Sequence, residues 1–377
     1  MFPKLVPKSI VPIHDQLVAF FSAEIRCGRM IQGEAMPSEN TLAKQLGISR
    51  MTVRRVFDTL VFDGLLARRQ GKGTFVAKDG AVRPDKGLIG FIGQTLTNGI
   101  SSEFVAHLNS AIERHDLQGW HLLVCGADNQ PDKMMHHIET LREHGVQGII
   151  LTPAIIDPYN KNLEPLLALR QGDVPFVLMD RYIELVDSDY VISDNFRASY
   201  IAAKHLIGLG HKQILHISSL EDLPSTPQRL NGYKAALAEH GIEFDPDLVL
   251  SWPHSLVPLG NGELSTIMGK GATALYTYSD QAAMHAIKGL EAQGVRVPQD
   301  MAVVGMGDVR VAWGPEPVLT TVRQDFVAMA DKVLDLLLRR IDGSVDGVPF
   351  QHEVLDVELV IRNSCGASNL NRTIKTE

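Results

Sequence analysis

The chain has 377 residues, of which 45% are hydrophobic and 21% are charged, and its net charge at pH 7 is −8. This composition favours two or three folded domains and excludes an intrinsically disordered chain. No apolar run reaches the ~20 residues of a membrane helix, and the first residues lack the apolar block of a secretory signal. The cysteines Cys27, Cys125 and Cys365 fit no disulfide framework or metal-binding spacing. We therefore expect a cytoplasmic protein with no membrane partner.

Charge is distributed unevenly along the chain. Residues 1–80 contain twelve Lys and Arg against seven Asp and Glu, a net charge of +5, whereas the remainder carries −13. A small basic segment before a larger acidic one indicates a nucleic-acid-binding module joined to a second functional part.

The basic segment has the pattern of a helix-turn-helix. Apolar residues at helical spacing predict a first helix over 13–27. Ser38 is placed to cap a second helix, Gly47 to turn the chain sharply, and Ser49 to cap a third helix. The third helix carries an apolar stripe of Val53, Val56, Phe57 and Leu60. Two short helices joined by a glycine turn, the second beginning near Arg50, are typical of a recognition helix that enters the major groove.

A basic hairpin is predicted after the third helix. Residues 65–77, LLARRQGKGTFVA, fit two short strands around a glycine-rich tip. Arg68 and Lys72 supply positive charge, and Gly71 and Gly73 allow the backbone to approach a phosphate closely. Such a hairpin after a helix-turn-helix indicates a wing, although an ordinary hairpin beside a solvated amphipathic helix is the alternative.

Residues 10–77 resemble the winged-helix domain of the GntR family, whose pattern of PSE, LA, LG-S-R-TVR, GL and R-x-G-x-GTFV they share. The resemblance implies contacts with double-stranded DNA from the helix-turn-helix and the wing. The residues expected to make these contacts are Ser38, Asn40, Ser49, Arg50, Thr52, Arg54, Arg68, Gly71, Lys72, Gly73 and Thr74. Asn40 stands where many members have arginine. Arg50 and Arg54 can each reach a guanine edge or a phosphate, and the sequence leaves open which one reads a base.

The larger part of the chain alternates strand-like and helical patterns. Residues 78–87 contain two glycines and a proline and are expected to form a linker. From Leu88 onward the strand-like runs are LIGFIG, HLLVCG, QGIILTP, VPFVLMD, KQILHIS, TALYTYS and MAVVGMG. Repeated βα units predict parallel sheets with helices on both faces, and about 290 residues favour two lobes. Ligands of such lobes bind at the carboxyl ends of the strands, here between the lobes.

The segment from about Leu88 to Asn363 resembles the LacI/GalR-type regulatory domain, which shares its fold with periplasmic sugar-binding proteins. The shared segments are VPFVLMDR, VISDNF, AAKHLIGLGHKQILHIS, RLNGYKAAL, GVRVPQDMAVVGMGD and LTTVRQDF. A GntR-type head on this domain is similar to the arabinose repressor type. The implied fold is a small α/β winged helix-turn-helix domain over 1–77, a linker over 78–87, and a two-lobed α/β periplasmic-binding-protein-like domain with parallel sheets over 88–377, for effector binding and dimerisation.

The second resemblance also implies a set of effector-binding residues. These are Asp180, Arg181, Arg229, Trp252, Ser279, Asp280, Gly307, Asp308 and Gln324. The sequence departs from the family at two of them, because Ser279 replaces the usual Asn and Gly307 replaces the usual first Asp. An alternative interpretation stays open, in which Asp280 caps a helix, Asp180 and Arg181 form a structural pair, and Trp252 belongs to the core.

These observations together predict a ligand-responsive transcriptional repressor of carbohydrate-related genes. As a homodimer it would bind a pseudo-palindromic operator, and a sugar or sugar derivative between the lobes would change the operator affinity. A solute-binding protein of a transporter and a DNA-binding regulator with a degenerate cleft are the alternatives. The sequence contains no catalytic motif, metal-ligand set or cofactor fingerprint, so we expect no enzyme activity, metal or cofactor. A helix from about Asp325 to Ile341 is expected in the core, with part of it available as a dimer seam.

Overall fold

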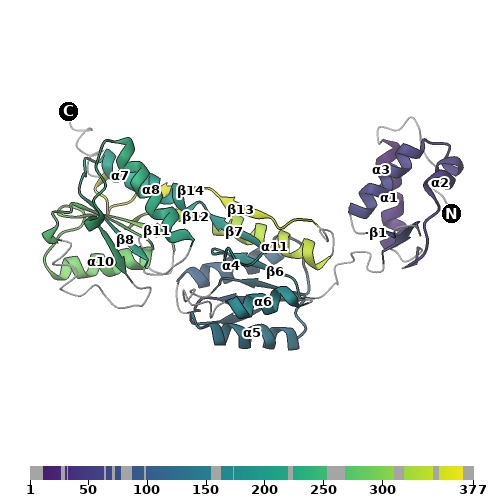
Figure 1. Cartoon of the computed structure of the whole chain (residues 1–377), viewed down its shortest axis with the longest axis horizontal. Helices are drawn as coiled ribbons and strands as arrows, with labels where there is room; N and C mark the ends of the chain where they lie inside the picture. The colour runs from purple at the N-terminus through teal and green to yellow at the C-terminus, as the bar shows by residue number, and fades with distance from the viewer. Residues whose placement is uncertain are drawn as a thin grey trace. The chain divides into compact units, whose positions relative to one another are not determined.

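The computed structural model describes residues 12–26, 30–31, 33–62, 65–69, 73–77, 87–96, 99–153, 163–172, 174–219, 224–252, 268–309, 318–342 and 348–367. The chain divides into two compact units. One unit comprises Met1–Gly87, Leu117–Trp120 and Leu337–Pro349, and the other comprises Leu88–Asp116, His121–Leu336 and Phe350–Glu377. Figure 1 labels the helices and strands of both units.

The N-terminal part of the first unit is a winged helix domain, which we call the head. Its elements are α1 (Ile13–Arg26), α2 (Glu39–Leu46), α3 (Arg50–Phe62), β1 (Leu66–Arg69) and β2 (Gly73–Val76). The two strands form an antiparallel hairpin, with Leu66 opposite Val76. One apolar core joins the helices to the hairpin. It contains the expected stripe of α3, Val53, Val56, Phe57 and Leu60, each at most 1% exposed. The helix-turn-helix and the hairpin expected from the sequence are confirmed.

The rest of the described chain forms two six-stranded sheets. The first has the strand order β13-β7-β6-β5-β3-β4, and the second has the order β14-β12-β11-β10-β8-β9. The strands of the first sheet are β3 (Gly87–Gly93), β4 (Trp120–Gly126), β5 (Gly148–Leu151), β6 (Phe176–Met179), β7 (Asp189–Ser193) and β13 (His352–Leu355). The strands of the second are β8 (Ile214–Ser219), β9 (Val249–Trp252), β10 (Ala274–Thr277), β11 (Ala302–Gly307), β12 (Thr320–Gln324) and β14 (Val357–Val360). Strand β3 begins at Gly87, the last residue of the expected linker.

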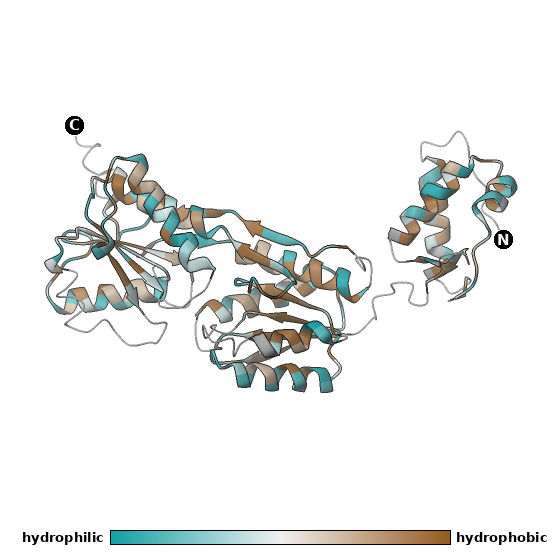
Figure 2. Cartoon of the chain, in the orientation of Figure 1, coloured by the Kyte–Doolittle hydropathy of each residue, from teal (hydrophilic) through white to brown (hydrophobic). Residues whose placement is uncertain are grey.

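Helices cover both faces of each sheet, as expected from the repeated βα units. The first sheet carries α4 (Gly99–Arg114), α5 (Pro131–Glu143), α6 (Leu163–Gln171) and α11 (Phe326–Ile341), and we call this assembly the N-lobe. The second carries α7 (Asn195–Gly208), α8 (Ser225–Glu239) and α10 (Asp280–Ala292), with a short 3-10 turn η1 (Pro246–Leu248), and forms the C-lobe. In the C-lobe α10 packs on one face, and α7 and α8 pack on the other. Figure 2 shows hydrophobic strands between helices with mixed faces.

The parallel pairing predicted for the sheets is confirmed, with one exception at an edge. Pairs such as β10 with β11 and β5 with β6 are parallel. Strand β14 instead pairs antiparallel with β12, with Thr321 opposite Val360. The sequence did not indicate this strand, because VELV is a short run without a preceding helix of its own.

The described chain passes between the lobes at three places: from β7 to α7, from β12 to α11, and from β13 to β14. At the second place α11 leaves the C-lobe sheet and packs on α4, where the rings of Phe326 and Phe104 meet edge-to-face at 5.1 Å. The apolar residues of α11, Val333, Leu334, Leu336, Leu337 and Leu338, are each at most 4% exposed. The expectation that this helix belongs to the core is confirmed.

Candidate functional site

The helix-turn-helix of the head is held in shape by local caps. Ser38 Oγ accepts a hydrogen bond from the Thr41 amide at 3.1 Å and caps α2. Gly47 ends the same helix with a φ of 66°, in the left-handed region that glycine enters without strain. Ser49 Oγ accepts from the Thr52 amide at 3.0 Å and caps α3. Ser38, Gly47 and Ser49 therefore cap or end these helices, as the sequence predicts.

The predicted DNA-contacting side chains on α2 and α3 are available to solvent. Asn40, Ser49, Arg50 and Arg54 are exposed, on the side of the helices away from the apolar core, and Thr52 is half-buried. Exposed Met51 lies among them at 59%. An exposed helix start that carries arginine and hydroxyl groups can offer both charged and neutral donors to phosphates and base edges.

The wing is only partly described. Gly73 begins β2 with a φ of 109°, a conformation that favours glycine, and Thr74 lies beside it half-buried. Arg68 on β1 is exposed. Gly71 and Lys72, which the sequence also assigns to DNA contacts, lie outside the described residues.

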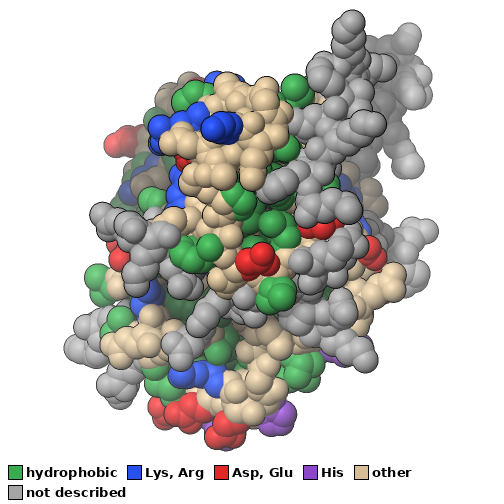
Figure 3. Space-filling model, turned by 90° about the vertical axis from the view of Figure 1, so that its right-hand side faces the viewer, with side chains coloured by type: hydrophobic (Ala, Val, Ile, Leu, Met, Phe, Trp, Pro, Cys, Tyr) green, Lys and Arg blue, Asp and Glu red, His purple; other side chains and the backbone are tan. Residues whose placement is uncertain are grey.

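Acidic side chains accompany the arginines of the head. Arg50 Nε donates to Glu39 Oε2 at 3.1 Å, and Arg68 Nη2 lies 2.6 Å from Asp58 Oδ1 and 3.7 Å from Glu39 Oε1. Figure 3 shows one face of the molecule, on which Lys and Arg side chains lie at several separate places among hydrophobic and other side chains. Two of the expected DNA-contacting arginines, Arg50 and Arg68, are thus paired with carboxylates of the head.

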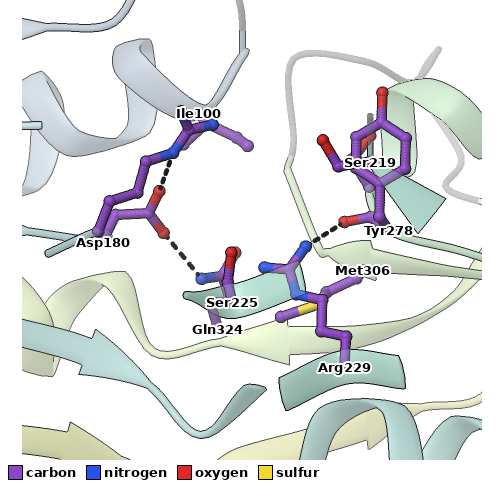
Figure 4. A pocket seen from close by; sticks show the side chains of 10 residues that line it. Ile100, Asp180, Ser219, Ser225, Arg229, Tyr278, Met306 and Gln324 are labelled. Carbon is purple, nitrogen blue, oxygen red and sulfur yellow. Dashed lines mark hydrogen bonds and ion pairs between the residues drawn. The ribbon is translucent and has the colours of Figure 1, made fainter. Parts of the chain in front are cut away.

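A second candidate site is a polar pocket within the second unit, lined from both lobes. Its empty space, counted together with space open to solvent, is about 450 Å³. It is lined by Ile100, Asp180, Arg181, Ser219, Ser225, Arg229, Tyr278, Ser279, Met306 and Gln324. Five of these were predicted from the sequence: Asp180, Arg181, Arg229, Ser279 and Gln324. Figure 4 shows Asp180 and Arg229 reaching the pocket from different elements.

Asp180 follows β6 directly and has a φ of 68°, which is uncommon for a residue with a side chain. Its carboxylate accepts a hydrogen bond from Gln324 Nε2 at 3.2 Å and lies 3.7 Å from Arg181 Nε. Gln324 Nε2 also donates to Ser193 Oγ at 3.0 Å. Gln324 ends β12 of the C-lobe, whereas Asp180 follows β6 and Ser193 ends β7 of the N-lobe, so these bonds join the lobes at one edge of the pocket.

Arg229, on α8, is half-buried and is positioned by two hydrogen bonds. Its Nε donates to Asn195 Oδ1 at 2.9 Å, and its Nη1 donates to the Tyr278 carbonyl oxygen at 2.8 Å. Burial lowers the pKa of its guanidinium, whereas the nearby Asp180 carboxylate opposes that effect. An arginine stays protonated under these conditions, so Arg229 brings a fixed positive charge to the pocket.

Four of the predicted effector residues do not line this pocket. Asp280, 2% exposed, accepts bonds from the Thr321 hydroxyl and the Val309 amide instead. Burial raises the pKa of its carboxyl to about 6. Asp280 does not cap α10, because Ser279 Oγ accepts from the Ala282 amide and makes that cap.

Gly307 is absent from the pocket wall because its backbone turns toward Asp280. Its φ is 132°, and a Cβ there would lie 3.4 Å from Asp280 Oδ2 and 3.2 Å from Val309 Cγ2. Any residue with a side chain would be strained at this position, because a φ of 132° favours glycine.

The side chains of Asp308 and Trp252 likewise contact other parts of the C-lobe instead of the pocket. The Asp308 carboxylate accepts from Arg323 Nε at 2.8 Å and from Arg362 Nη2 at 2.6 Å. Trp252 ends the edge strand β9 and packs against the apolar core beneath α10. This position agrees with the alternative in which Trp252 is a core residue.

Several pocket residues escaped sequence reasoning. They are Ile100, Ser219, Ser225, Tyr278 and Met306, together with Asn195, which positions Arg229. Ser219 ends β8 and Tyr278 follows β10, so the rule that ligands bind at carboxyl ends of strands could have found both. Ile100 belongs to the first turn of α4, a place that no pattern in the sequence marks.

Within the described residues there is no group of three or more His, Cys, Asp or Glu side chains that could hold a metal ion. A search of the same residues finds no helix of the length and apolarity that crossing a membrane requires.

Comparisons with known proteins identify the two parts of the chain. Residues 14–76 match the bacterial regulatory proteins of the gntR family, and residues 203–365 match the periplasmic binding protein-like domain. The arabinose metabolism transcriptional repressor of Geobacillus stearothermophilus is 28% identical over 364 residues, which cover 94% of this chain and 98% of that protein. The HTH-type transcriptional repressor PurR of Haemophilus influenzae strain PittEE is 30% identical over 278 residues, which cover 72% of this chain and 80% of that protein.

A solved structure extends the likeness to the fold. The LacI family transcriptional regulator from Enterococcus faecium with bound ribose is 25% identical, with a TM-score of 0.60, and covers 74% of this chain and 98% of that chain.

The chain belongs to the family of helix-turn-helix transcriptional repressors with a periplasmic binding protein-like regulatory domain. Within that class it is a DNA-binding, ligand-responsive repressor whose head is of the gntR family, an architecture shared with its arabinose repressor relatives.

Proposed function

We propose that the protein acts in the cytoplasm as a homodimeric repressor of genes of carbohydrate metabolism, and that a sugar or sugar derivative in the interlobe pocket changes its affinity for the operator. The pocket carries this proposal. It combines a carboxylate, two guanidinium groups, an amide and hydroxyl groups in a space of about 450 Å³. Such groups pair with the vicinal hydroxyls of a sugar through charge-assisted hydrogen bonds.

The names of similar proteins support a carbohydrate effector. Two relatives are named arabinose metabolism transcriptional repressor, and the structural neighbour from Enterococcus faecium holds ribose. We assign the effector contacts to Asp180, Arg181, Arg229, Ser279 and Gln324, and residues 88–377 to effector binding and dimerisation.

On the DNA side, we assign operator contacts to the head, residues 1–77. Two heads related by a two-fold axis would read a pseudo-palindrome whose half-sites lie about 34 Å apart, one turn of DNA, or a multiple of it. The contacts belong to Ser38, Asn40, Ser49, Arg50, Thr52, Arg54, Arg68, Gly71, Lys72, Gly73 and Thr74.

We place the coupling between effector binding and operator affinity in the segments that connect the lobes. Gln324 and Asn195 lie where the chain passes between the two sheets, and each is bonded to a charged pocket residue, Asp180 or Arg229. A ligand that replaces these bonds changes the balance between lobe arrangements, and a coupling of roughly 1–3 kcal/mol would alter operator affinity about 5–150-fold.

Thermal denaturation of the full-length protein against a panel of mono- and disaccharides, sugar acids and sugar phosphates tests the effector proposal. A ligand at a hundred times its Kd stabilises the folded protein by about 2.7 kcal/mol, which raises Tm measurably. A shift that disappears in Asp180→Asn is expected. No shift with any member of the panel would favour the alternative of a DNA-binding regulator with a degenerate cleft.

A further inference from the structure

Met51, the second residue of α3, exposes a long apolar side chain on the helix to which we assign operator contacts. It is 59% exposed, and Ile31 is the other large apolar side chain that is exposed among the described residues of the head. Single exposed apolar side chains are common on protein surfaces, so exposure alone assigns Met51 no role. The direction of the side chain and the chemistry of its neighbours have to be considered with it.

Met51 points away from the core of the head. An α-helix turns by about 100° per residue, which places Met51 about 170° around the helix axis from the centre of the buried stripe that runs from Val53 to Leu60. On the same scale Arg50 and Arg54 lie about 70° and 110° from that centre. Met51 therefore lies closer than either arginine to the middle of the face that α3 turns to solvent.

The neighbours of Met51 on this face are positively charged. Arg54 and Arg55 follow it at the three- and four-residue spacing of side-chain neighbours on a helix, and both are exposed. Exposed arginines bind the phosphate oxygens of DNA. A thioether has no hydrogen-bond donor, so Met51 cannot bind a phosphate as the arginines can. A partner of Met51 on DNA has to be an apolar group.

The first turn of α3 holds Met51 at a fixed place. The Ser49 and Thr52 hydroxyl oxygens lie 2.9 Å apart, and Arg50 Nε donates to Glu39 Oε2 at 3.1 Å. Thr52 also carries a methyl group, but it is half-buried. Met51 is therefore the apolar side chain that the start of α3 presents outward.

The base edges in the major groove offer one apolar group, the C5-methyl of thymine. The N-terminal residues of a recognition helix are the ones that reach base edges, and Met51 is among them. We propose that Met51 determines part of the operator sequence by packing on the C5-methyl of one thymine in each half-site. This inference rests on the proposed function, because it requires α3 to enter the major groove. Met51 is not one of the contacts that the family resemblance implies.

Replacing thymidine with deoxyuridine tests this contact, because the two nucleotides differ only in the C5-methyl group. The probes are an operator selected from random DNA and a series of duplexes in which deoxyuridine replaces the thymidines of that operator one at a time. Fluorescence anisotropy with the full-length protein measures the Kd of each duplex. At one position of each half-site the Kd is expected to rise about fourfold, the value for losing the burial of one methyl group.

Three variants assign the effect to Met51. Met51→Ala removes the apolar end of an exposed side chain, so its Tm should stay unchanged and the ratio of the deoxyuridine Kd to the thymidine Kd should fall to near one. Met51→Leu keeps an apolar side chain and should retain most of the ratio. Met268→Ala removes an exposed methionine outside the head and should leave the ratio unchanged.

The outcomes distinguish this inference from the function on which it rests. The inference is overturned if no deoxyuridine substitution weakens binding by the wild type, or if the weakening persists undiminished in Met51→Ala. In either case, loss of operator binding in the double variant Arg50→Ala, Arg54→Ala leaves the proposed function standing. If that double variant binds the operator in full, the assignment of α3 as the recognition helix fails, and the role of Met51 fails with it.

Discussion

Glu39 and Arg50 link the two helices of the helix-turn-helix: the Arg50 Nε donates to Glu39 Oε2 at 3.1 Å. Because the bond uses Nε, the two terminal nitrogens of Arg50 remain available to a guanine or a phosphate. The same carboxyl group lies 3.7 Å from Arg68 on the wing strand β1. One acidic side chain at the start of α2 thus contacts an expected DNA-binding residue of the recognition helix and another of the wing.

Glu39→Gln should lower operator discrimination more than it lowers DNA binding in general. Exposed ion pairs of this kind contribute about 0.2–1 kcal/mol, so the ratio of specific to non-specific affinity should decrease by a factor between about 1.4 and 5. Non-specific affinity should stay equal or rise, because a negative charge near the phosphates is removed. Fluorescence anisotropy with operator and scrambled duplexes measures both, and Glu291→Gln on α10 is the charge-matched control. An unchanged ratio would show that Glu39 does not orient Arg50.

Arg50→Ala and Arg54→Ala should identify which arginine reads a base. Loss of a bidentate guanine contact costs about 1–3 kcal/mol and relaxes specificity at one position of the operator. Loss of a phosphate contact instead weakens binding to all sequences and reduces the slope of log K against log salt by about one. Binding to a set of single-base operator variants at several salt concentrations separates the two. Full operator binding by the double variant would refute the assignment of α3 as the recognition helix.

Gly305→Ala should destabilise the C-lobe. A Cβ at this position of β11 would lie 2.4 Å from Asp280 Oδ1 and 2.7 Å from Leu319 Cδ2, and both groups are buried. Overpacking of this kind costs about 1–3 kcal/mol, which a urea denaturation series can measure. Gly208→Ala at the end of α7 is the control, because a Cβ there meets nothing within 4 Å. Equal stability of the two variants would contradict the packing around Asp280.

Asp280 should make the protein less stable as pH rises from about 4 to 6. Burial raises the pKa of its carboxyl to about 6, above the value near 3.9 of an exposed Asp. Between these values the folded state binds the proton and the unfolded state does not, so the free energy of unfolding falls by up to about 3 kcal/mol. The difference between wild type and Asp280→Asn, measured by denaturation from pH 4 to 7, should change over that window. A constant difference would show that Asp280 titrates normally.

The elements of the head could be predicted almost residue by residue, because its signals are local. Ser38 and Ser49 cap adjacent helices, and the stripe from Val53 to Leu60 is buried as helical spacing requires. The parallel sheets could be predicted in outline, since repeated βα units marked the strands β3, β4, β5, β6, β8, β10 and β11. The short strands β7, β9, β12 and β13 and the antiparallel strand β14 were not predicted as strands.

The pocket could be predicted only in part, because its wall depends on where strands end in space. Asp180, Arg229 and Gln324 line the pocket, and all three contact residues beyond their own element. Gly307 and Trp252 also lie at the ends of strands, but neither lines the pocket. The backbone turns at Gly307, and Trp252 packs against the apolar core. The positions of Gly307 and Trp252 therefore depend on tertiary contacts, which a local sequence pattern does not reveal.

The central claim is that one chain couples occupancy of the interlobe pocket to operator binding. Its most direct test is the Kd of the full-length protein for an operator selected from random DNA, measured with and without a saturating concentration of a sugar that raises Tm. A change of about 5–150-fold is predicted, and the change should be absent in Arg229→Gln. An operator affinity that is independent of the bound sugar would contradict the account.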